Sequence, residues 1–183
     1  MKNVYERFFI FIQSSFGKKE KEDLYDFIWK NYKKKISFYI SNIIPYSHPD
    51  FEDMIQEVMI KIHKNLHTFN PMHSFKAWVY KIARNHSLDY VKNKQNSFHS
   101  SAGLENAEGL KRNNPEEIII IDNIISRIDQ IIDSLESTDR EIAYLKFYEN
   151  IRYKDISSII NMNPNTVKSR IRLIKRVIRE KLK

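Results

Sequence analysis

The stretch "MNPNTVKSRIRLIKR", residues 162–176, holds five cations and three large aliphatic side chains in fifteen residues. Asn161, just before it, can adopt the left-handed conformation that ends a helix. Asn163 is a favourable N-cap residue, and Pro164 suits the first helical position, where a missing N–H costs nothing. A short helix is predicted immediately upstream, over Tyr153–Ile160. Two helices joined by so short a turn predict a helix-turn-helix.

Another helix is predicted upstream of this pair. Thr138 and Glu141 have the spacing of a capping box, and the helix that they open should run through Tyr148. In the helix that follows it, Ile156 and Ile159 should face inward. The predicted unit is therefore a small group of packed helices that ends in a long basic helix.

The basic helix separates into two faces at 100° per residue. The stripe that should pack on the preceding helices is Val167, Ile171, Ile174, Ile178 and Leu182. The opposite face carries Asn165, Ser169, Arg172 and Arg176, with Lys168 and Arg179 on its flank. Guanidinium, amide and hydroxyl groups are able to hydrogen-bond to base edges. A solvated face would explain the cations near the C-terminus, which suit the helix dipole, but not Lys168, Arg170 and Arg172 near the positive end. An anionic partner explains those better.

Composition supports a polyanionic partner and a helical fold. The chain of 183 residues carries a net charge of +8, with a pI near 9.5. Its 3 glycines and 5 prolines are few, which favours long helices over turn-rich sheets. There is no cysteine, which excludes disulfides, thiolate zinc sites and cysteine nucleophiles. No apolar run approaches the ~20 residues of a membrane span, and no signal peptide is evident, so a cytoplasmic protein is expected.

The chain divides into two helical segments separated by a polar one. Helical periodicity runs from about Leu24 to Asn93 and resumes at Ile118. Residues 93–117, "NKQNSFHSSAGLENAEGLKRNNPEE", are polar and carry almost no apolar period. The predicted fold class is all-α, with two small helical domains joined by a flexible linker.

In the first segment, "HPDFEDMIQEVMIKIHKNL" (residues 48–66) predicts an amphipathic helix with Asp50 as its N-cap. The predicted buried stripe is Phe51, Ile55, Val58, Ile62 and Leu66. The outward face shows Asp53, Gln56, Glu57 and Ile60. An isoleucine among exposed carboxylates favours a protein contact over a DNA contact, although a single exposed isoleucine is also ordinary.

The following stretch, "FNPMHSFKAWVYKIARNHSLDYVKN" (residues 69–93), predicts a short loop from Phe69 to Ser74 and then a helix. Its rings are Phe75, Trp78, Tyr80 and Tyr90, and they alternate with Lys76, Lys81, Arg84 and Lys92. Such interleaving suits stacking on unpaired bases with phosphate neutralisation alongside. The rings could instead be core. Core is favoured for Phe75, Val79 and Ile82, which share a face, and less so for Tyr80, which should point away beside Arg84.

Three motifs together resemble bacterial RNA polymerase sigma factors. They are "DFEDMIQEV" (residues 50–58), the spaced set Phe75, Trp78, Ile82, Ala83, Asn85 and Asp89, and "NTVKSRI" (residues 165–171). Their order, the polar linker and the length resemble the extracytoplasmic-function (ECF) subfamily, which keeps only sigma domains two and four. The resemblance implies an N-terminal extension of unassigned role (1–20), a domain-two helical bundle (21–95), a linker (96–117) and a domain-four helix-turn-helix (118–183).

The resemblance also implies roles for particular residues. The surface that binds core polymerase, on the clamp coiled coil of the largest subunit, would be Asp53, Gln56, Glu57 and Ile60. The −10 element would be captured and melted by Phe69, Asn70, Ser74, Phe75, Trp78, Lys81, Arg84 and Asn85. The −35 element would be bound by Asn163, Asn165, Thr166, Lys168, Ser169, Arg170, Arg172 and Arg176. Within this last set, Lys168, Ser169 and Arg172 would contact bases, and Asn163, Thr166, Arg170 and Arg176 phosphates.

Further expectations follow from the same resemblance. The partners would be core RNA polymerase (clamp coiled coil and flap), promoter DNA and an anti-sigma factor, with no membrane insertion. No catalytic residue, metal or cofactor is expected. The chain departs from the family pattern at Asn165, where a glycine is common, and in the loop "NPMHS", which is shorter than usual.

Two other functions compete with this one. His63 and His67, at i and i+4, with His73 nearby, have a spacing that suits a metal, but no glutamate lies between them as in zincins, and surface histidines are the better interpretation. The nearer rival is a stand-alone two-domain helix-turn-helix regulator that binds an operator without polymerase. The acidic face distinguishes the two, because such a regulator has no use for Asp53, Gln56 and Glu57 as a partner surface.

Overall fold

The structure, a computed structural model, describes residues 18–70, 72–97 and 118–183, and over these ranges it contains helices and turns but no β-strand. The all-α prediction is confirmed. The chain separates into two compact units, Met1–Gly103 and Leu104–Lys183. The predicted linker, 96–117, lies almost wholly outside the described residues, as does most of the extension 1–20. The helix that begins at Phe75 runs through Ser97. It therefore extends beyond Asn93, where the polar segment begins in the sequence.

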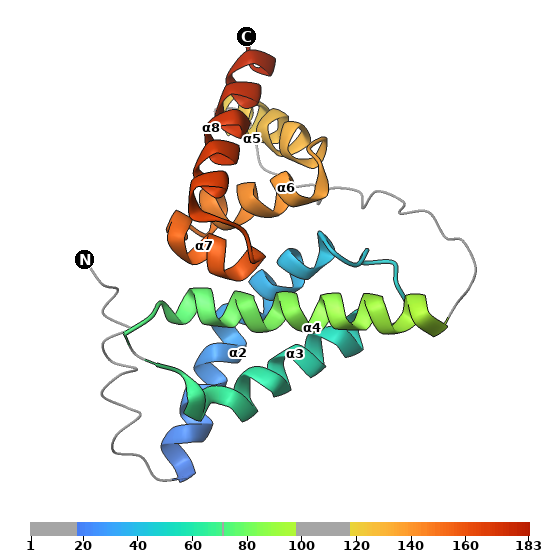
Figure 1. The fold of residues 1–183 in the computed structure, drawn as a ribbon, viewed down its shortest axis with the longest axis vertical. Helices are drawn as coiled ribbons and strands as arrows, with labels where there is room; N and C mark the ends of the chain where they lie inside the picture. Colours follow the sequence, from blue (N-terminus) through green and yellow to red (C-terminus); the bar gives the residue numbers. More distant parts are fainter. Residues whose placement is uncertain (1–17, 71, 98–117) are drawn as a thin grey trace. The chain divides into compact units, whose positions relative to one another are not determined.

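The N-terminal unit consists of α2 (Lys18–Ser41), α3 (Phe51–Asn65), the 3₁₀ turn η1 (Leu66–Thr68) and α4 (Phe75–Ser97). Each of the three α-helices packs against the other two (Figure 1). The fully buried side chains at their centre are Ile28, Ile36, Tyr39, Ile40, Ile55, Val58, Met59, Ile62, Val79, Tyr80 and Ala83. Burying each large apolar side chain contributes about 1.5–3 kcal/mol. This core holds α3 and α4 side by side.

The predicted stripe of α3 is confirmed over most of its length. Phe51, Ile55, Val58 and Ile62 are all buried, whereas Leu66 falls in η1 and is half-buried. Two methionines also join the core, Met54 and Met59.

Two predictions for this unit were wrong in detail. Tyr80 does not point away but is fully buried, with its ring edge-on to Tyr39 at 5.0 Å. Asp50 occupies the N-cap position of α3, but its side chain makes no capping hydrogen bond. The carboxylate instead accepts hydrogen bonds from the Tyr90 hydroxyl and, at 2.5 Å, from Lys94 Nζ. Asp50 therefore ties the start of α3 to the second half of α4.

The C-terminal unit consists of α5 (Ile118–Asp133), α6 (Ser137–Ala143), the π-helical turn η2 (Tyr144–Tyr148), α7 (Tyr153–Ile160) and α8 (Pro164–Lys181). The long helix α8 packs on each of the other α-helices of the unit (Figure 1). The largest contributions to its core come from Ile142, Leu145, Ile156 and Ile159, with Val167 and Ile174 from α8.

The capping box predicted at Thr138 is absent. The N-cap of α6 is Glu136, and Thr138 lies inside the helix. Glu141, the expected partner, is buried at 7% exposure. The helix also widens into the π-turn η2 after Ala143 instead of continuing as an α-helix to Tyr148.

The turn between α7 and α8 matches the prediction in each of its elements. Asn161 is left-handed, with φ 59° and ψ 50°, and its N–H bonds to the carbonyl of Ser157. The Asn163 side chain accepts a hydrogen bond of 2.9 Å from the N–H of Asn165, and Pro164 begins the helix. The stripe of α8 is buried at Val167, Ile171 and Ile174 and half-buried at Ile178 and Leu182. The helix-turn-helix is confirmed.

Candidate functional site

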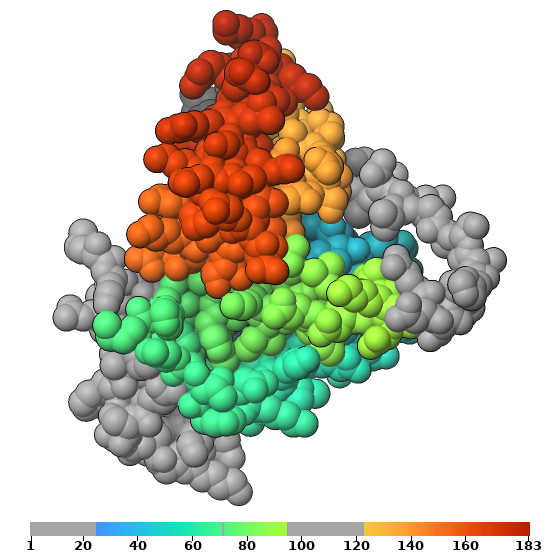
Figure 2. Space-filling model, in the orientation of Figure 1, coloured from blue at the N-terminus to red at the C-terminus, as the bar shows by residue number. Residues whose placement is uncertain are grey.

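The outer face of α8 is exposed and basic. The predicted DNA-binding residues on it that are exposed are Asn163, Asn165, Thr166, Lys168, Ser169, Arg172 and Arg176. The first turn of α8 contains no acidic residue, so the N–H groups at its N-terminus add to the positive potential. Figure 2 shows α8, in orange-red and red, covering much of the visible surface of the C-terminal unit. The helix therefore presents a continuous cationic and polar face to an anionic ligand.

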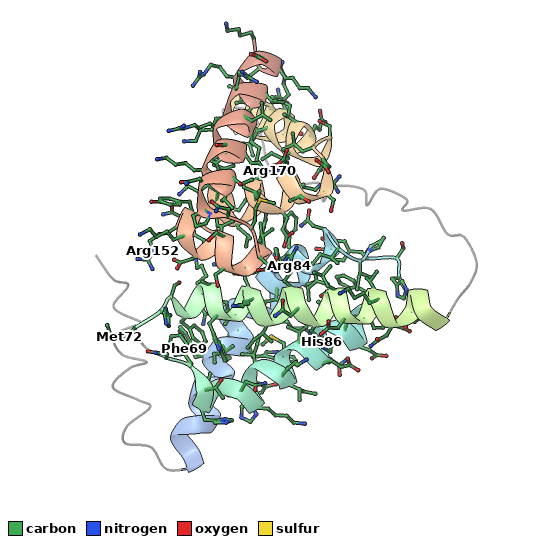
Figure 3. All side chains as sticks on the ribbon, viewed as in Figure 1. Phe69, Met72, Arg84, His86, Arg152 and Arg170 are labelled. Atoms are coloured by element: carbon green, nitrogen blue, oxygen red, sulfur yellow. The ribbon has the colours of Figure 1, made fainter. Side chains whose placement is uncertain are left out.

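Arg170 lies apart from this face. Its guanidinium Nη1 donates a hydrogen bond of 2.8 Å to Asp139 Oδ1 and lies 3.7 Å from Glu136 Oε2. The side chain is half-buried (it is labelled in Figure 3), and the hydrogen bond to Asp139 raises the pKa of Arg170. Arg170 thus joins α8 to α6, and its predicted contact with phosphate stays a prediction.

Leu173 of α8 was not among the binding residues predicted from the sequence. It is 42% exposed, four residues after Ser169 and three before Arg176. These spacings place the three side chains on one face of the helix. Its position could have been recognised from the sequence, because at 100° per residue Leu173 falls outside the apolar stripe of α8.

The predicted acidic face of α3 is also exposed. Asp53, Gln56, Glu57 and Ile60 all point to solvent, and Ile60 is 46% exposed. Glu57 Oε2 lies 2.8 Å from His86 Nε2 on α4, and the other ring nitrogen of His86 lies 3.4 Å from Lys61 Nζ. Figure 3 shows His86 on the α3 side of α4 and Arg84 on the opposite side. His86 was not predicted. It fixes Glu57 in position from the neighbouring helix.

The aromatic residues predicted to bind the −10 element form a cluster. Phe69 and Phe75 are each only 4% exposed. The ring centroids of Phe69 and Phe75 are 5.2 Å apart, and each lies 5.6 Å from that of Trp78. Tyr32 of α2 adds an edge contact to Phe75 at 5.6 Å. The rings of Phe69 and Phe75 thus pack within the protein and anchor the two ends of the loop between η1 and α4.

The exposed part of this region lies along the side of α4 that faces α3 and η1. Lys81 and Asn85 are exposed, whereas Arg84 and Trp78 are half-buried. Trp78 and Asn85 line an open, partly polar pocket of about 320 Å³ between α3–η1 and α4. The other residues that line it are Lys61, Asn65, Thr68, Ile82 and Asp89. It offers a ring, amides, a carboxylate and a cation within one small volume.

The loop beside this pocket is organised by local hydrogen bonds. Asn70 Oδ1 accepts one of 2.9 Å from the N–H of Met72, and Ser74 Oγ accepts one of 3.3 Å from the N–H of Ala77 in the first turn of α4. Met72 is 78% exposed, and Figure 3 shows it away from the helices. Asn70 and Ser74, both predicted to bind DNA, thus shape the loop.

A larger groove lies within the C-terminal unit, between α5, η2 and α8. Its volume is about 540 Å³ and its wall is mostly apolar. The residues that line it are Ile125, Ile128, Asp129, Ile132, Phe147, Tyr148, Lys175, Ile178, Arg179 and Leu182. This groove was not predicted from the sequence, because it is assembled from three separate elements.

Two family models match the two structural units. The model for sigma-70 region 2 matches residues 28–97, and that for sigma-70 region 4 matches residues 125–178. The chain belongs to the ECF sigma factors of the sigma-70 family. This sigma factor carries its region-4 match on the helix-turn-helix and its region-2 match on the bundle with the acidic face. The predicted resemblance is confirmed.

Curated relatives agree with this assignment, and solved structures share the fold. The sigma factor is 27% identical over 174 residues to the ECF RNA polymerase sigma factor SigW of Bacillus subtilis, covering 91% of this chain and 92% of that one. It is 28% identical over 148 residues to the ECF RNA polymerase sigma-E factor of Escherichia coli, covering 76% of each. Its fold is similar to that of the sigma factor RpoE in complex with the anti-sigma factor NepR from Bartonella quintana, with a TM-score of 0.61, 17% identity and coverage of 88% of this chain and 97% of that one. A second similar structure is CnrH in complex with the cytosolic domain of CnrY, with a TM-score of 0.55, 14% identity and 87% of each chain covered.

The described histidines of this sigma factor are not gathered into a metal site. His63 packs its ring on Tyr25 at 4.7 Å, and in the described part of the chain no three histidine or carboxylate side chains are grouped as metal ligands would be. None of the described helices is both long enough and apolar enough to cross a membrane.

Proposed function

We propose that this sigma factor is a dissociable specificity subunit, without an active site of its own, that docks on core RNA polymerase and directs it to promoters with −10 and −35 elements. The observation that carries the proposal is the exposed acidic face of α3, which lies in the same chain as the exposed basic face of α8. An acidic face repels DNA, so it has no use in a regulator that works unaided. It suits a subunit that must bind a protein partner and DNA at once.

The acidic face is the proposed docking surface for the clamp coiled coil of the largest polymerase subunit. Ile60 supplies exposed apolar area at the C-terminal end of the face, about one turn after the carboxylate of Glu57 and two turns after that of Asp53. An apolar contact bordered by charges is typical of protein interfaces. The contact of His86 with Glu57 at 2.8 Å holds one of these carboxylates in a defined direction before the partner arrives.

The apolar groove of the C-terminal unit is the proposed site for the polymerase flap. Isoleucines of α5 and α8 and the Phe147 and Tyr148 rings form its wall, and Asp129, Lys175 and Arg179 add charges. A groove of about 540 Å³ with this composition suits an amphipathic helix laid along it. Because the groove and the outer face of α8 use different residues, the unit can bind flap and DNA together.

For the −10 element we propose that an unpaired base enters the pocket between α3–η1 and α4. Extruding a base costs a few kcal/mol, and stacking on an aromatic ring returns about 1–3 kcal/mol. Trp78 supplies such a ring, and Asn85 supplies an amide for the edge of the base. Lys81, exposed on the same side of α4, is placed to neutralise the displaced strand. The buried Phe69 and Phe75 rings fix the loop and do not themselves stack on DNA.

For the −35 element we propose that α8 lies in the major groove. Lys168, Ser169 and Arg172 would contact base edges, and Asn163, Thr166 and Arg176 phosphates. Asn165 stands at a position where a glycine is common in the family. Because the Asn163 side chain already caps the N–H of Asn165, the backbone there has a fixed conformation with which to approach a phosphate.

We also propose that an anti-sigma factor holds this protein inactive in the cytoplasm until its inducing signal arrives. The two similar solved structures support this, because one is a sigma factor bound to an anti-sigma factor and the other is also a two-protein complex.

The test is transcription from genomic promoter fragments by core polymerase with and without the chain. We expect the chain to bind core and to support initiation at a distinct set of start sites. Asp53→Lys combined with Glu57→Lys should weaken core binding at least tenfold, because both carboxylates face the partner. Glu52→Lys is the matched control, since it makes the same kind of charge change on an exposed residue at the edge of the face. A chain that fails to bind core but binds an operator tightly by itself is the stand-alone regulator instead.

A further inference from the structure

Leu173 is an exposed apolar side chain at the edge of the polar, basic face of α8. It is 42% exposed, and its neighbours about one turn away on that face, Ser169 and Arg176, are exposed as well. The apolar stripe that holds α8 in the unit, at Val167 and Ile174, lies on the other side of the helix. The packing of α8 therefore does not require a leucine at 173.

A major groove offers a specific apolar partner for such a side chain. Among the four bases, only thymine presents a methyl group there, at C5, whereas cytosine presents an amino donor close by. An isobutyl group gains from burying that methyl group. Against the amino group of cytosine it would remove water without replacing the lost hydrogen bond, which is unfavourable.

We propose that Leu173 is a specificity-determining residue of the −35 site, which selects thymine by packing on its C5 methyl group. This rests on the proposed function, in which α8 occupies the major groove. Arg172 and Ser169 hydrogen-bond to polar base edges, and Leu173 adds a contact that reads a methyl group. The −35 element should accordingly contain one thymine that cannot be exchanged for cytosine.

The spacing on the helix restricts where this thymine lies. Leu173 is one turn beyond Ser169 toward the C-terminus of α8 and almost one turn before Arg176. Its thymine should therefore lie between the base pair contacted by Ser169 and the phosphate contacted by Arg176, and not at the end of the element read by Lys168.

The experiment removes the methyl group from the DNA and the isobutyl group from the protein. Holoenzyme made with the full chain is bound to promoter duplexes in which each thymine of the −35 element, on either strand, is replaced singly by deoxyuridine. For the unmodified chain we expect one position at which this replacement lowers affinity about fourfold, the value of one buried methyl group. Leu173→Ala should bind the thymine duplex less tightly and lose its sensitivity at that position alone. Ile124→Ala, which shortens a different exposed aliphatic side chain of the same unit (46% exposed), should keep this sensitivity.

Two results would overturn the inference. One is that Leu173→Ala holoenzyme responds to every deoxyuridine duplex as the unmodified holoenzyme does. The other is that no deoxyuridine replacement lowers the affinity of either the unmodified or the Leu173→Ala holoenzyme. Failure of the proposed function has a different signature. In that case Arg172→Ala would leave promoter affinity unchanged, whereas if only the inference fails, Arg172→Ala still lowers affinity while Leu173→Ala does not change thymine selectivity.

Discussion

The ion pair between Arg170 and Asp139 allows a prediction that separates a structural cation from a DNA-binding one. Arg170→Met removes the guanidinium but keeps most of the apolar stem, so that the change is largely electrostatic. Lys168→Met is the matched control on the same helix, because Lys168 is exposed on the proposed DNA-binding face. We expect the first substitution to lower stability and the second to lower affinity for DNA.

The magnitude follows from the exposure of the pair. The Asp139 side chain is 14% exposed and that of Arg170 is 32% exposed. A hydrogen bond to a charged group is worth about 1.5–3 kcal/mol, and solvent access to Arg170 puts this one at the lower end. Glu136, 73% exposed and 3.7 Å away, adds little. We therefore expect Arg170→Met to destabilise the C-terminal unit by about 1.5–2 kcal/mol, which raises its opening equilibrium roughly 10- to 30-fold.

Two measurements check these expectations, hydrogen exchange for stability and salt dependence for DNA binding. Tryptophan fluorescence cannot report the stability of the C-terminal unit, because both tryptophans lie in the N-terminal unit. Hydrogen exchange of peptides from α6 and α8 reports the C-terminal unit directly and should show the increased opening in Arg170→Met only. The salt dependence of promoter binding then measures phosphate contacts, and Lys168→Met should reduce the slope of log K against log salt by about one.

The opposite pattern would refute the assignment. If Arg170→Met left exchange in α6 and α8 unchanged and lowered the salt slope by one, Arg170 would be a phosphate ligand that releases Asp139 on binding. A charge swap, Arg170→Asp with Asp139→Arg, tests the pair itself. It should recover part of the lost protection if the two side chains interact directly.

Two further predictions concern the backbone and the acid sensitivity of the units. Asn161→Ala should destabilise the C-terminal unit by about 1 kcal/mol, because the left-handed conformation is unfavourable for alanine. Asn161→Gly should leave the stability nearly unchanged, because glycine adopts that conformation readily. Hydrogen exchange of α7 and α8 measures both effects. The hydrogen bonds from Lys94 and Tyr90 lower the pKa of Asp50, so the stabilisation that they give is present above the unfolded pKa of about 3.9 and is lost as the pH falls through the folded value. Asp50→Asn should therefore lower the stability of the N-terminal unit at pH 7, measured by tryptophan fluorescence in urea, and the difference from the unmodified chain should close below about pH 4.

The features predicted from sequence are those that local signals determine. The α7–α8 turn depends on three positions within four residues, Asn161, Asn163 and Pro164, and each has the conformation predicted for it. The apolar stripes of α3 and α8 depend only on helical periodicity. The exposure of the acidic face and of the basic face follows from those stripes, because residues opposite a buried stripe face solvent.

The predictions that failed required knowledge of neighbouring helices. Tyr80 was placed outside because its angle lies away from Phe75 and Val79. However, α4 packs on both α2 and α3, so its buried arc is wider than one stripe and includes Tyr80. The capping box at Thr138 failed because the chain already becomes helical at Ser137. No pattern along one helix could have revealed that His86 meets Glu57 or that Arg170 meets Asp139.

The ion pair with Asp139 neutralises one of the three cations in the first half of α8, Arg170, and leaves the other two without an internal counter-charge in the described residues. Cations at the N-terminal end of α8 pointed to an anionic partner, and the structure supplies an internal carboxylate for Arg170 alone among Lys168, Arg170 and Arg172, within the described residues. Lys168 and Arg172 are still exposed in the first half of α8, whose first turn contains no acidic residue. These two cations add to the positive potential of that half in the free protein, and a phosphate backbone neutralises it on binding. Promoter binding should therefore stabilise the first turns of α8 more in the unmodified chain than in a chain with methionine at both positions, and hydrogen exchange with and without DNA measures the difference. Equal protection in the two chains would show that these cations contribute nothing to docking.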